Sequence, residues 1–306
     1  MRWRGNRSSD NIEDRRGHST SGMSAMSGSG GILRLLPIVF RFLGVKGTAV
    51  VVLCLGAYGL FTGNLGSMLG MLGGQNTAIS SPQSNAPIQQ SAAEKELVEF
   101  VSVILADTED TWQVLFQKKG LQYQEPRLVL FRDVVKSACG TAQSAMGPFY
   151  CPGDKQVYID LEFFDQLANR FNAPGDFAQA YVIAHEVGHH IQTITGISAK
   201  VHQAKQKVNK VEANKLSVLQ ELQADCLAGV WANYANKTRQ LLEVGDVEEG
   251  LRAATAIGDD TLQRQASGRV TPDSFTHGSS AQRVKWFKTG LSNGDMDSCD
   301  TFSSGA

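Results

Sequence analysis

Two histidines and a glutamate stand at metal-binding spacing near the middle of the chain, in the run AHEVGHH at residues 184–190. His185 and His189 are four residues apart, so on a helix their imidazoles lie on one face, one turn from each other, and can bind the same ion. Glu186 lies beside that face, where its carboxylate can act as a general base on a water that the metal activates. The His-Glu-x-x-His spacing is typical of helices that hold catalytic zinc. The run therefore predicts a site for one Zn²⁺ ion.

A catalytic zinc needs a third protein ligand and keeps one position open for water. The residues after His189 do not supply a third histidine in the x-x-Gly-x-x-His pattern. The later run QELQADC at residues 220–226 supplies two carboxylates instead, because Glu221 and Asp225 are four apart and share a helix face. We predict that Glu221 is the third ligand and that Asp225 accepts a hydrogen bond from the far nitrogen of a zinc-binding histidine. The alternative, a solvated helix face, fits poorly with the apolar residues around both carboxylates.

Two further histidines could support this chemistry. His277 lies in a turn before a helix that continues through Val284 and Phe287. From there it could donate a hydrogen bond to the oxyanion of a tetrahedral intermediate, or it could cap the helix, and the sequence leaves both roles open. His190 points about 100° away from the neighbouring ligand, so we expect it to pack between elements or to support the site.

The elements that must position these residues are mostly helices. Apolar residues at helical spacing predict helices over residues 94–118, 177–195 and about 216–234. Short runs of bulky residues at 127–131 and 156–161 predict strands. The predicted fold class is therefore α+β, mostly helical with a small sheet.

The helix with the zinc motif has start and stop signals of its own. Pro174-Gly175 breaks the chain, and Asp176 with Gln179 has the spacing of a capping box. Gly196 ends the pattern. The two histidines therefore lie near the middle of the helix, where neighbouring turns fix their rotamers.

The chain divides into parts of different composition. Over 306 residues the formal net charge is −1, which predicts no nucleic-acid partner. Residues 1–31 are rich in Ser, Gly and Arg, and we expect a disordered, basic tail. Residues 32–72 are a predicted membrane region, with one transmembrane helix at about residues 48–70. Residues 73–93 are a predicted polar linker, and residues 94–306 the predicted catalytic domain.

Basic residues near the membrane region predict its orientation. Residues 1–46 contain eight basic and three acidic residues, and basic flanks stay in the cytoplasm. The expected arrangement is a single-pass protein of the bacterial inner membrane, held in the lipid bilayer by one helix, with a cytoplasmic N-terminus and a periplasmic or other extracytoplasmic domain. A buried globular helix and a cleaved signal peptide are the alternatives, although the apolar stretch begins late and lacks a clear small-x-small cleavage site.

Four cysteines are candidates for two disulfide bonds. Cys139 and Cys151 bracket a loop rich in turn residues. In a reducing cytosol they would be inert thiols or metal ligands, whereas outside the membrane a disulfide is expected. Cys226 and Cys299 are the second predicted pair, which would tie the C-terminal segment to a core helix.

These motifs together resemble the putative neutral zinc metallopeptidase family, bacterial membrane-anchored proteins of the gluzincin type. The resemblance covers nearly the whole chain and is carried by MRWRG at 1–5, NIEDRR at 11–16, the loop from 139 to 152, AHEVGHH at 184–190 and the segment 221–229. It implies a zincin-like domain and a zinc endopeptidase activity on peptide or protein substrates.

The predicted reaction is hydrolysis of a peptide bond. His185, His189 and Glu221 would hold the zinc, and Glu186 would take a proton from the attacking water and pass it to the leaving amine. One alternative is a catalytically silent adaptor or chaperone that keeps the fold and the metal. Another is structural zinc, but such sites usually have four protein ligands.

Overall fold

A four-stranded sheet forms one side of the fold in the computed structural model, which describes residues 1–17 and 90–303. The strand order is β1-β2-β6-β5, with β1, β2 and β6 parallel and β5 antiparallel to β6 at the edge. The strands are β1 (Ile12–Asp14), β2 (Arg127–Phe131), β5 (Phe149–Cys151) and β6 (Gln156–Asp160). The strand predictions at 127–131 and 156–161 are confirmed by β2 and β6.

A hairpin covers the outer face of this sheet. It consists of β3 (Val134–Ser137) and β4 (Gly140–Gln143), which pair antiparallel. Apolar side chains of the hairpin and the sheet form a small core of their own, in which Val129 and Tyr158 are buried. The outer face is therefore closed, and the opposite face is the one that packs against helices.

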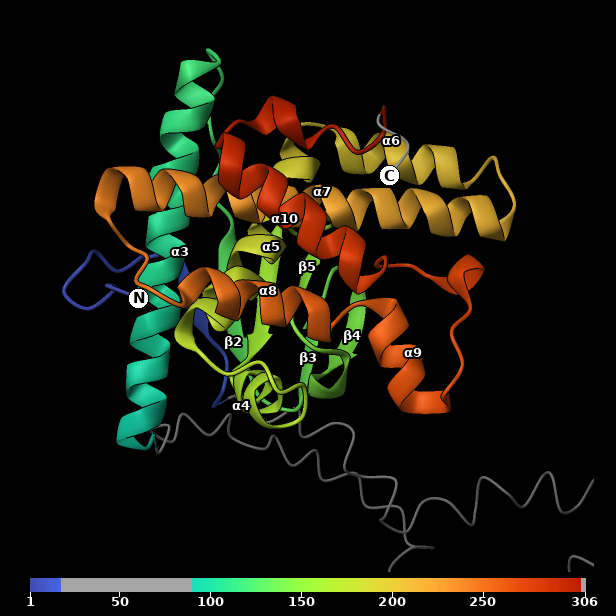
Figure 1. Cartoon of the computed structure of the whole chain (residues 1–306). Coiled ribbons are helices and arrows are strands. Elements are labelled where there is room, and N and C mark those ends of the chain that lie inside the picture. The colour runs from blue at the N-terminus through green and yellow to red at the C-terminus, as the bar shows by residue number, and fades with distance from the viewer. Residues whose placement is uncertain (18–89, 304–306) are drawn as a thin grey trace, which may run out of the picture. The chain divides into compact units, whose positions relative to one another are not determined.

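Helices make up most of the described residues, as predicted (Figure 1). They are α3 (Ala92–Lys118), α4 (Glu162–Asn169), α5 (Asp176–Ile194), α6 (Ile197–Lys205), α7 (Lys210–Arg239), α8 (Asp246–Ala256), α9 (Asp259–Ser267) and α10 (Ser280–Asn293), with 3₁₀ turns η2 (Ser144–Met146), η3 (Pro272–Ser274) and η4 (Met296–Cys299). The three predicted helices correspond to α3, α5 and α7, and α7 extends beyond its predicted range at both ends.

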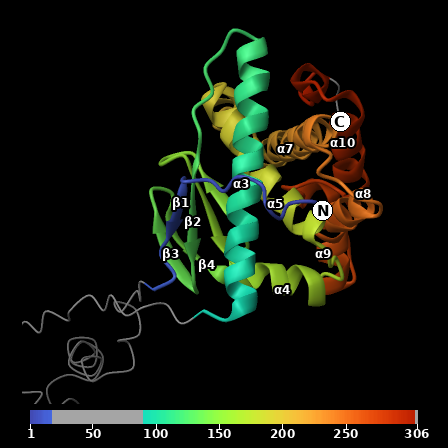
Figure 2. The same cartoon turned by 90° about the vertical axis from the view of Figure 1, so that its left-hand side faces the viewer.

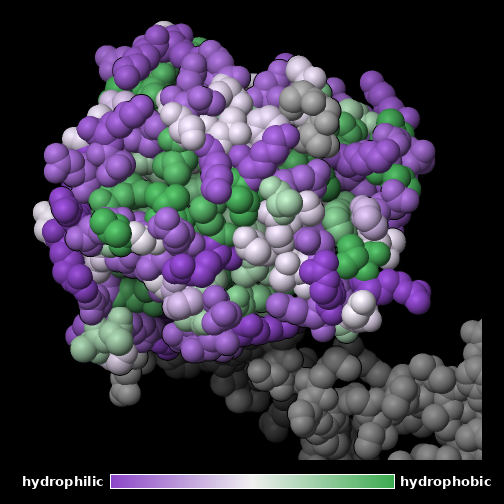
Figure 3. Space-filling view, in the orientation of Figure 1, coloured by the Kyte–Doolittle hydropathy of each residue, from purple (hydrophilic) through white to green (hydrophobic). Residues whose placement is uncertain are grey.

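The main core lies between the sheet and the helices. Figure 2 shows the strands on one side of α3 and the helices α7, α8 and α10 on the other. Trp112, Tyr181 and Trp231, from α3, α5 and α7, are completely buried in this core. The face seen in Figure 3 is largely hydrophilic, with hydrophobic residues gathered where α8 and α10 lie. The helix that carries the zinc motif is thus enclosed by packed elements.

Small residues let α7 approach its neighbours closely. A Cβ atom on Gly188 of α5 would lie 3.0 Å from the carbonyl oxygen of Ala224, and one on Gly290 of α10 would lie 1.9 Å from that of Cys226. A side chain at either glycine would push the helices apart. The contact at Gly188 therefore helps to set the distance between the histidines of α5 and the carboxylates of α7, and the contact at Gly290 sets how closely α10 packs on α7.

Residues 1–17 are part of this fold, so the prediction of a disordered tail is wrong for them. β1 pairs with β2, and Trp3 is buried with its ring edge-on to Phe100 at a centroid distance of 5.3 Å. The buried guanidinium of Arg16 lies 2.8 Å from a carboxylate oxygen of Glu94. The segment makes these contacts with residues far along the chain, and therefore local composition did not reveal them.

The start of α5 also differs from the prediction. Gly175 occupies the N-cap position, and Asp176 lies in the first turn without capping the helix. The carboxylate of Asp176 instead accepts hydrogen bonds from the Met1 ammonium at 3.0 and 3.2 Å. A long-range ion pair thus takes the place of the predicted local cap.

The predicted membrane topology needs correction as well. Among the described residues no helix is long and apolar enough to cross a membrane. The helix predicted at about 48–70, and nearly all of the linker predicted at 73–93, lie outside the described residues. One crossing between β1 and β2 would place these paired strands on opposite sides of a membrane. A cytoplasmic N-terminal segment combined with an extracytoplasmic domain is therefore incompatible with the sheet.

Both predicted cysteine pairs form disulfides. Cys139 is bonded to Cys151, and Cys226 of α7 is bonded to Cys299 at the end of η4. The second bond joins residues 73 positions apart and fixes the C-terminal segment against the helix that carries Glu221.

We predict that Trp3→Ala lowers the free energy of unfolding by about 3 to 5 kcal/mol, because it removes a buried indole from a packed core. Chemical denaturation of the full chain measures the effect. Leu121, which is 54% exposed, provides the control, and Leu121→Ala should change stability by no more than about 0.5 kcal/mol. Equal stability of Trp3→Ala and wild type would show that the N-terminal segment is not packed as described.

Candidate metal centre

The predicted site residues line one cavity of about 480 Å³. His185, Glu186 and His189 reach it from α5, and Glu221 reaches it from α7. His277, which lies just before α10, borders the same cavity. The fold therefore brings together residues from three separate parts of the chain.

Three donor groups meet at the spacing that a zinc ion requires. The Nε2 atom of His185 lies 3.2 Å from one carboxylate oxygen of Glu221, and that of His189 lies 3.4 Å from the other. Metal–ligand bonds of about 2.0 to 2.1 Å in a tetrahedron separate two ligand atoms by about 3.3 to 3.4 Å. Two imidazoles and one carboxylate are also a donor set that suits zinc. The residues present therefore fit a zinc ion.

A buried carboxylate fixes the orientation of His185. The Nδ1 atom of His185 lies 2.8 Å from Oδ1 of Asp225, which is completely buried. Since a carboxylate at that site accepts, Nδ1 donates its proton to Asp225, and Nε2 is turned toward Glu221 and the cavity. Asp225 thus has the supporting position that the sequence predicts.

Asp225 is in turn held by residues that the sequence did not single out. Arg283 of α10 donates two hydrogen bonds of 2.9 Å, one to each oxygen of Asp225. The hydroxyl of Tyr181 also donates to Asp225, and Arg283 contacts that hydroxyl at 3.2 Å. Asp225, Arg283 and Tyr181, together with His185, form one buried network across α5, α7 and α10.

The signals for two of these residues are present in the sequence. Tyr181 lies four residues before His185, so helical spacing places it on the same face of α5. Arg283 follows His277 by six residues in the predicted terminal helix. Neither spacing shows which helix the residue will contact, because that depends on how α10 packs on α7.

The electrostatics of the site favour a cation. Burial raises the pKa of Glu221, but the neighbouring His189 and His185 lower it more, and the result lies well below the usual value. Burial likewise raises the pKa of Asp225, while Arg283 and His185 bring it down to about 2. Both groups are therefore ionised near neutral pH. Because Arg283 balances Asp225, the remaining charges of Glu221 and Glu186 match a divalent ion.

Glu186 faces the same cavity without being one of the three clustered donors. Its side chain is buried, and burial raises its pKa above the usual value, an effect that His185 and His189 partly offset. A raised pKa brings a carboxylate closer to the range in which it exchanges protons efficiently at neutral pH. The position and the pKa both suit a general base.

His277 is oriented by an aspartate and does not cap the helix. Its Nδ1 atom lies 3.3 Å from Oδ1 of Asp259, and the other oxygen of Asp259 accepts backbone N–H groups from residues 276–278. The cap of α10 is Ser279, which forms a capping box with Gln282. Of the two roles left open for His277, capping is therefore wrong.

His190 has no part in the donor cluster. Its Nδ1 atom accepts from the hydroxyl of Tyr150 at 3.1 Å, and its Nε2 atom donates to the carbonyl oxygen of Gln124. Burial lowers the pKa of His190 to about 4, so it stays neutral. It joins α5 to the edge of the sheet, which is the packing role expected from its direction.

A second cluster of carboxylates lies away from the cavity and already has partners. It consists of Asp176, Asp246 and Glu249. The ammonium of Met1 lies 3.0 Å from Asp176 and 3.4 Å from Asp246, and Glu249 accepts the backbone N–H of Phe177. Each of the three carboxylates therefore already has a partner within the protein.

Comparison with known proteins gives one family and several relatives. The family model described as "Putative neutral zinc metallopeptidase" matches residues 1–302. The chain is 50% identical over 305 residues to "Uncharacterized protein YpfJ" of Escherichia coli (strain K12), with 99% of each chain covered. It is 45% identical over 191 residues to "Uncharacterized protein Rv2575" of Mycobacterium tuberculosis, with 59% of this chain and 64% of the relative covered. No solved structure matches the chain.

We predict that Asp225→Asn weakens zinc binding by about 10 to 100-fold, the usual effect of losing the partner of a metal-bound histidine. Competition with a zinc-chelating dye measures the affinity. Asp297, a carboxylate that is 76% exposed and pairs with Lys119, supplies the control variant Asp297→Asn, which should bind zinc as the wild type does. Unchanged affinity in Asp225→Asn would remove this residue from the support of the metal site.

Proposed function

Because the chain belongs to the putative neutral zinc metallopeptidase family, we propose that it is a zinc-dependent endopeptidase that cleaves peptide or protein substrates. The observation that carries the proposal is the cluster of His185, His189 and Glu221 at zinc-ligand spacing, in a cavity that Glu186 also lines. Metal ligands alone would fit many zinc proteins. The buried carboxylate beside them distinguishes a hydrolytic site.

The zinc ion, when bound, supplies a Lewis acid that makes water a nucleophile near neutral pH and polarises a carbonyl group. His185, His189 and Glu221 are the residues that would hold it. Asp225 keeps the proton of His185 on Nδ1, so that Nε2 remains available to the ion. Asp225 thus orients the ring of His185 toward the metal position.

Glu186 and His277 are the residues proposed to act on the substrate, Glu186 by proton transfer and His277 by hydrogen bonding. Glu186 takes a proton from the attacking water and then protonates the leaving amine, which a carboxylate with a raised pKa can do. His277 donates its Nδ1–H to Asp259, and this hydrogen bond raises the pKa of His277. In its protonated form the ring also carries an Nε2–H, which can donate to the oxyanion that develops as the peptide carbonyl is attacked. One residue therefore moves the proton, and the other stabilises charge.

The shape of the site supports cleavage within a chain. The main cavity has apolar walls that include Phe163, Phe171 and Leu262. A second cavity of about 210 Å³ borders two of the proposed metal ligands, His189 and Glu221, and its lining includes the polar residues Ser198 and Lys205. Tyr150 also borders both cavities. A peptide that occupied both cavities would run past the metal site, as an endopeptidase requires.

A silent adaptor with the same fold is the alternative function, and structural zinc is another. An adaptor has no need of Glu186 and His277 in the cavity, each beside the metal ligands. A structural site would normally have a fourth protein ligand, and among the described residues the donor cluster contains three. Both observations favour the peptidase.

We also propose that the domain works in an extracytoplasmic, oxidising compartment. The Cys139–Cys151 and Cys226–Cys299 disulfides support this location, because such bonds persist outside the reducing cytosol. Because β1 pairs with β2, residues 1–17 would lie in that compartment too. Attachment to the lipid bilayer through residues 48–70 is a prediction about a segment outside the described residues, and it would have to leave β1 and β2 on the same side of the membrane.

We predict that Glu186→Gln abolishes peptide hydrolysis, with a loss of at least about 10² to 10⁴-fold, while zinc remains bound. The amide has the shape of the carboxylate but cannot take the proton. Release of a fluorescent product from a quenched peptide mixture measures hydrolysis, and a metal assay measures zinc. Chelation of the wild type should stop cleavage, and added zinc should restore it. Cleavage by Glu186→Gln at the wild-type rate would rule out the proposed mechanism.

A second prediction concerns the proposed oxyanion donor. His277→Ala should lower kcat by about 10² to 10³-fold with little change in KM and in bound zinc, because the hydrogen bond forms in the transition state. His202 lies on α6 and bonds to Gln206 on the surface, so His202→Ala is the matched control and should keep the wild-type kcat. An unaltered kcat in His277→Ala would assign His277 a structural role only.

A further inference from the structure

The second zinc-binding histidine has a support of a different kind from the first. The Nδ1 atom of His189 lies 2.9 Å from Oε1 of Gln192, one turn further along α5. Gln192 is completely buried. His185 thus contacts a carboxylate through Nδ1, whereas His189 contacts a neutral amide.

The remaining contacts of Gln192 decide which way its amide points. Its Nε2 atom donates to the backbone carbonyl of Gln220 at 2.6 Å and to Oε1 of Gln223 at 3.1 Å. Both partners are acceptors, so the nitrogen must face them and the oxygen must face His189. His189 therefore carries its proton on Nδ1, and its Nε2 atom is directed at Glu221 and the metal position.

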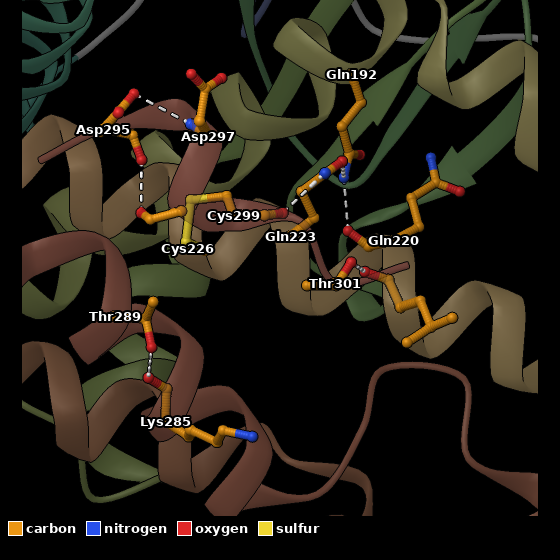
Figure 4. The surroundings of a disulfide bond; sticks show 12 residues. Gln192, Gln220, Gln223, Cys226, Lys285, Thr289, Asp295, Asp297, Cys299 and Thr301 are labelled. Carbon is orange, nitrogen blue, oxygen red and sulfur yellow. Dashed lines mark hydrogen bonds between the residues drawn. A yellow bond between two sulfur atoms is a disulfide. The ribbon is translucent and has the colours of Figure 1, made fainter. Parts of the chain in front are cut away.

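Gln223 extends this chain of hydrogen bonds to the C-terminal segment. Its own Nε2 atom donates to the backbone carbonyl of Cys299 at 3.0 Å, and the side chain of Gln223 is buried. Figure 4 shows Gln192, Gln220 and Gln223 beside the disulfide, with the dashed bond from Gln223 to Cys299. The path from the metal ligand to the disulfide passes through two amide side chains.

The disulfide holds the far end of this path. Cys226 and Cys299 are both buried, and the disulfide between them holds the backbone of Cys299 against α7. Thr301 adds a hydrogen bond of 2.7 Å to the carbonyl of Leu219. The acceptor that Gln223 needs therefore belongs to a segment whose position depends on a covalent bond that can be reduced.

We propose that Gln192 and Gln223 are positioning residues for the metal ligand His189, and that the Cys226–Cys299 disulfide maintains this arrangement, so that reducing the disulfide weakens metal binding. The inference rests on the proposed function in taking zinc as the metal. A dithiol would reduce the bond by exchange, which yields two cysteine thiols and the oxidised, cyclic disulfide of the reagent. The carbonyl of Cys299 is then free to leave Gln223. The amide of Gln192 keeps the carbonyl of Gln220 but loses Gln223, the second of its two acceptors, and is held less firmly.

Zinc affinity of the oxidised protein tests the two glutamines. All measurements use the Glu186→Gln background, where hydrolysis cannot interfere, and competition with a chelating dye as the readout. Gln192→Ala should bind zinc about 10 to 100-fold more weakly, because His189 loses its acceptor. Gln223→Ala should also weaken zinc binding, but by about tenfold or less, since Gln223 acts on His189 only through Gln192.

A matched control separates positioning from stability. Asn233 is also a buried amide on α7 that donates to a backbone carbonyl near the C-terminus, that of Leu291, but it has no contact with the metal ligands. Asn233→Ala should lower the unfolding temperature and leave zinc affinity unchanged. Wild-type zinc affinity in Gln192→Ala and Gln223→Ala, or an equal loss in Asn233→Ala, would overturn the proposal.

A double-mutant cycle tests the disulfide. Cys226→Ala with Cys299→Ala should weaken zinc binding when Gln223 is present and should cause little further loss in Gln223→Ala, because both changes break one path. Cys139→Ala with Cys151→Ala removes the other disulfide and should leave zinc affinity unchanged. Equal losses with and without Gln223 would contradict the proposed path. If the protein without Cys226 and Cys299 does not fold, the oxidised Gln223→Ala variant decides the question.

The outcomes also separate this inference from the proposed function. If the wild-type protein binds zinc but cleaves no peptide, the proposed peptidase activity is contradicted and the positioning path still stands. If the wild-type enzyme is active but the Gln192→Ala substitution does not change zinc affinity, the positioning path is contradicted and the proposed peptidase activity still stands.

Discussion

The buried charge of Asp225 is the constraint on which the rest of the site depends. A carboxylate inside a protein is costly without partners, and this one has three, from two other helices: His185 and Tyr181 of α5, and Arg283 of α10. Removing one partner of a buried ion pair typically costs about 3 to 5 kcal/mol. The contacts of Asp225 therefore fix how α5, α7 and α10 pack together. In that packing, Nε2 of His185 faces Glu221.

The two histidines proposed to bind the metal are supported by groups of different charge. An anion supports His185, and the cation of Arg283 cancels that anion. A neutral amide supports His189, so it fixes the proton on Nδ1 without adding charge. Glu221 and Glu186 then provide the two negative charges that a divalent metal can balance. A second carboxylate beside His189 would have left the buried site with an excess of negative charge.

Local periodicity in the sequence was enough to predict α5, α7 and the residues that share their faces. His185, His189, Glu221 and Asp225 follow from spacing, since a helix places residues four apart on one side. Spacing does not show which helix a face meets, and for that reason Arg283, Tyr181 and Gln192 became visible only in the fold. Residues 1–17 were misjudged because Trp3 and Arg16 find their partners on α3, about 80 or more residues away in the chain. A single membrane crossing at about residues 48–70 would put these partners on opposite sides of the bilayer, so the contacts disagree with the topology that the charge distribution suggested.

The central claim is that His185, His189 and Glu221 together hold a catalytic zinc ion. Crystals of the full chain loaded with zinc, with anomalous diffraction recorded at the zinc absorption edge, test it most directly. We expect one strong peak in the cavity, about 2.0 to 2.1 Å from both Nε2 atoms and about 2.0 to 2.2 Å from an oxygen of Glu221. A peak elsewhere, or a fourth protein side chain bound to the ion, would contradict it.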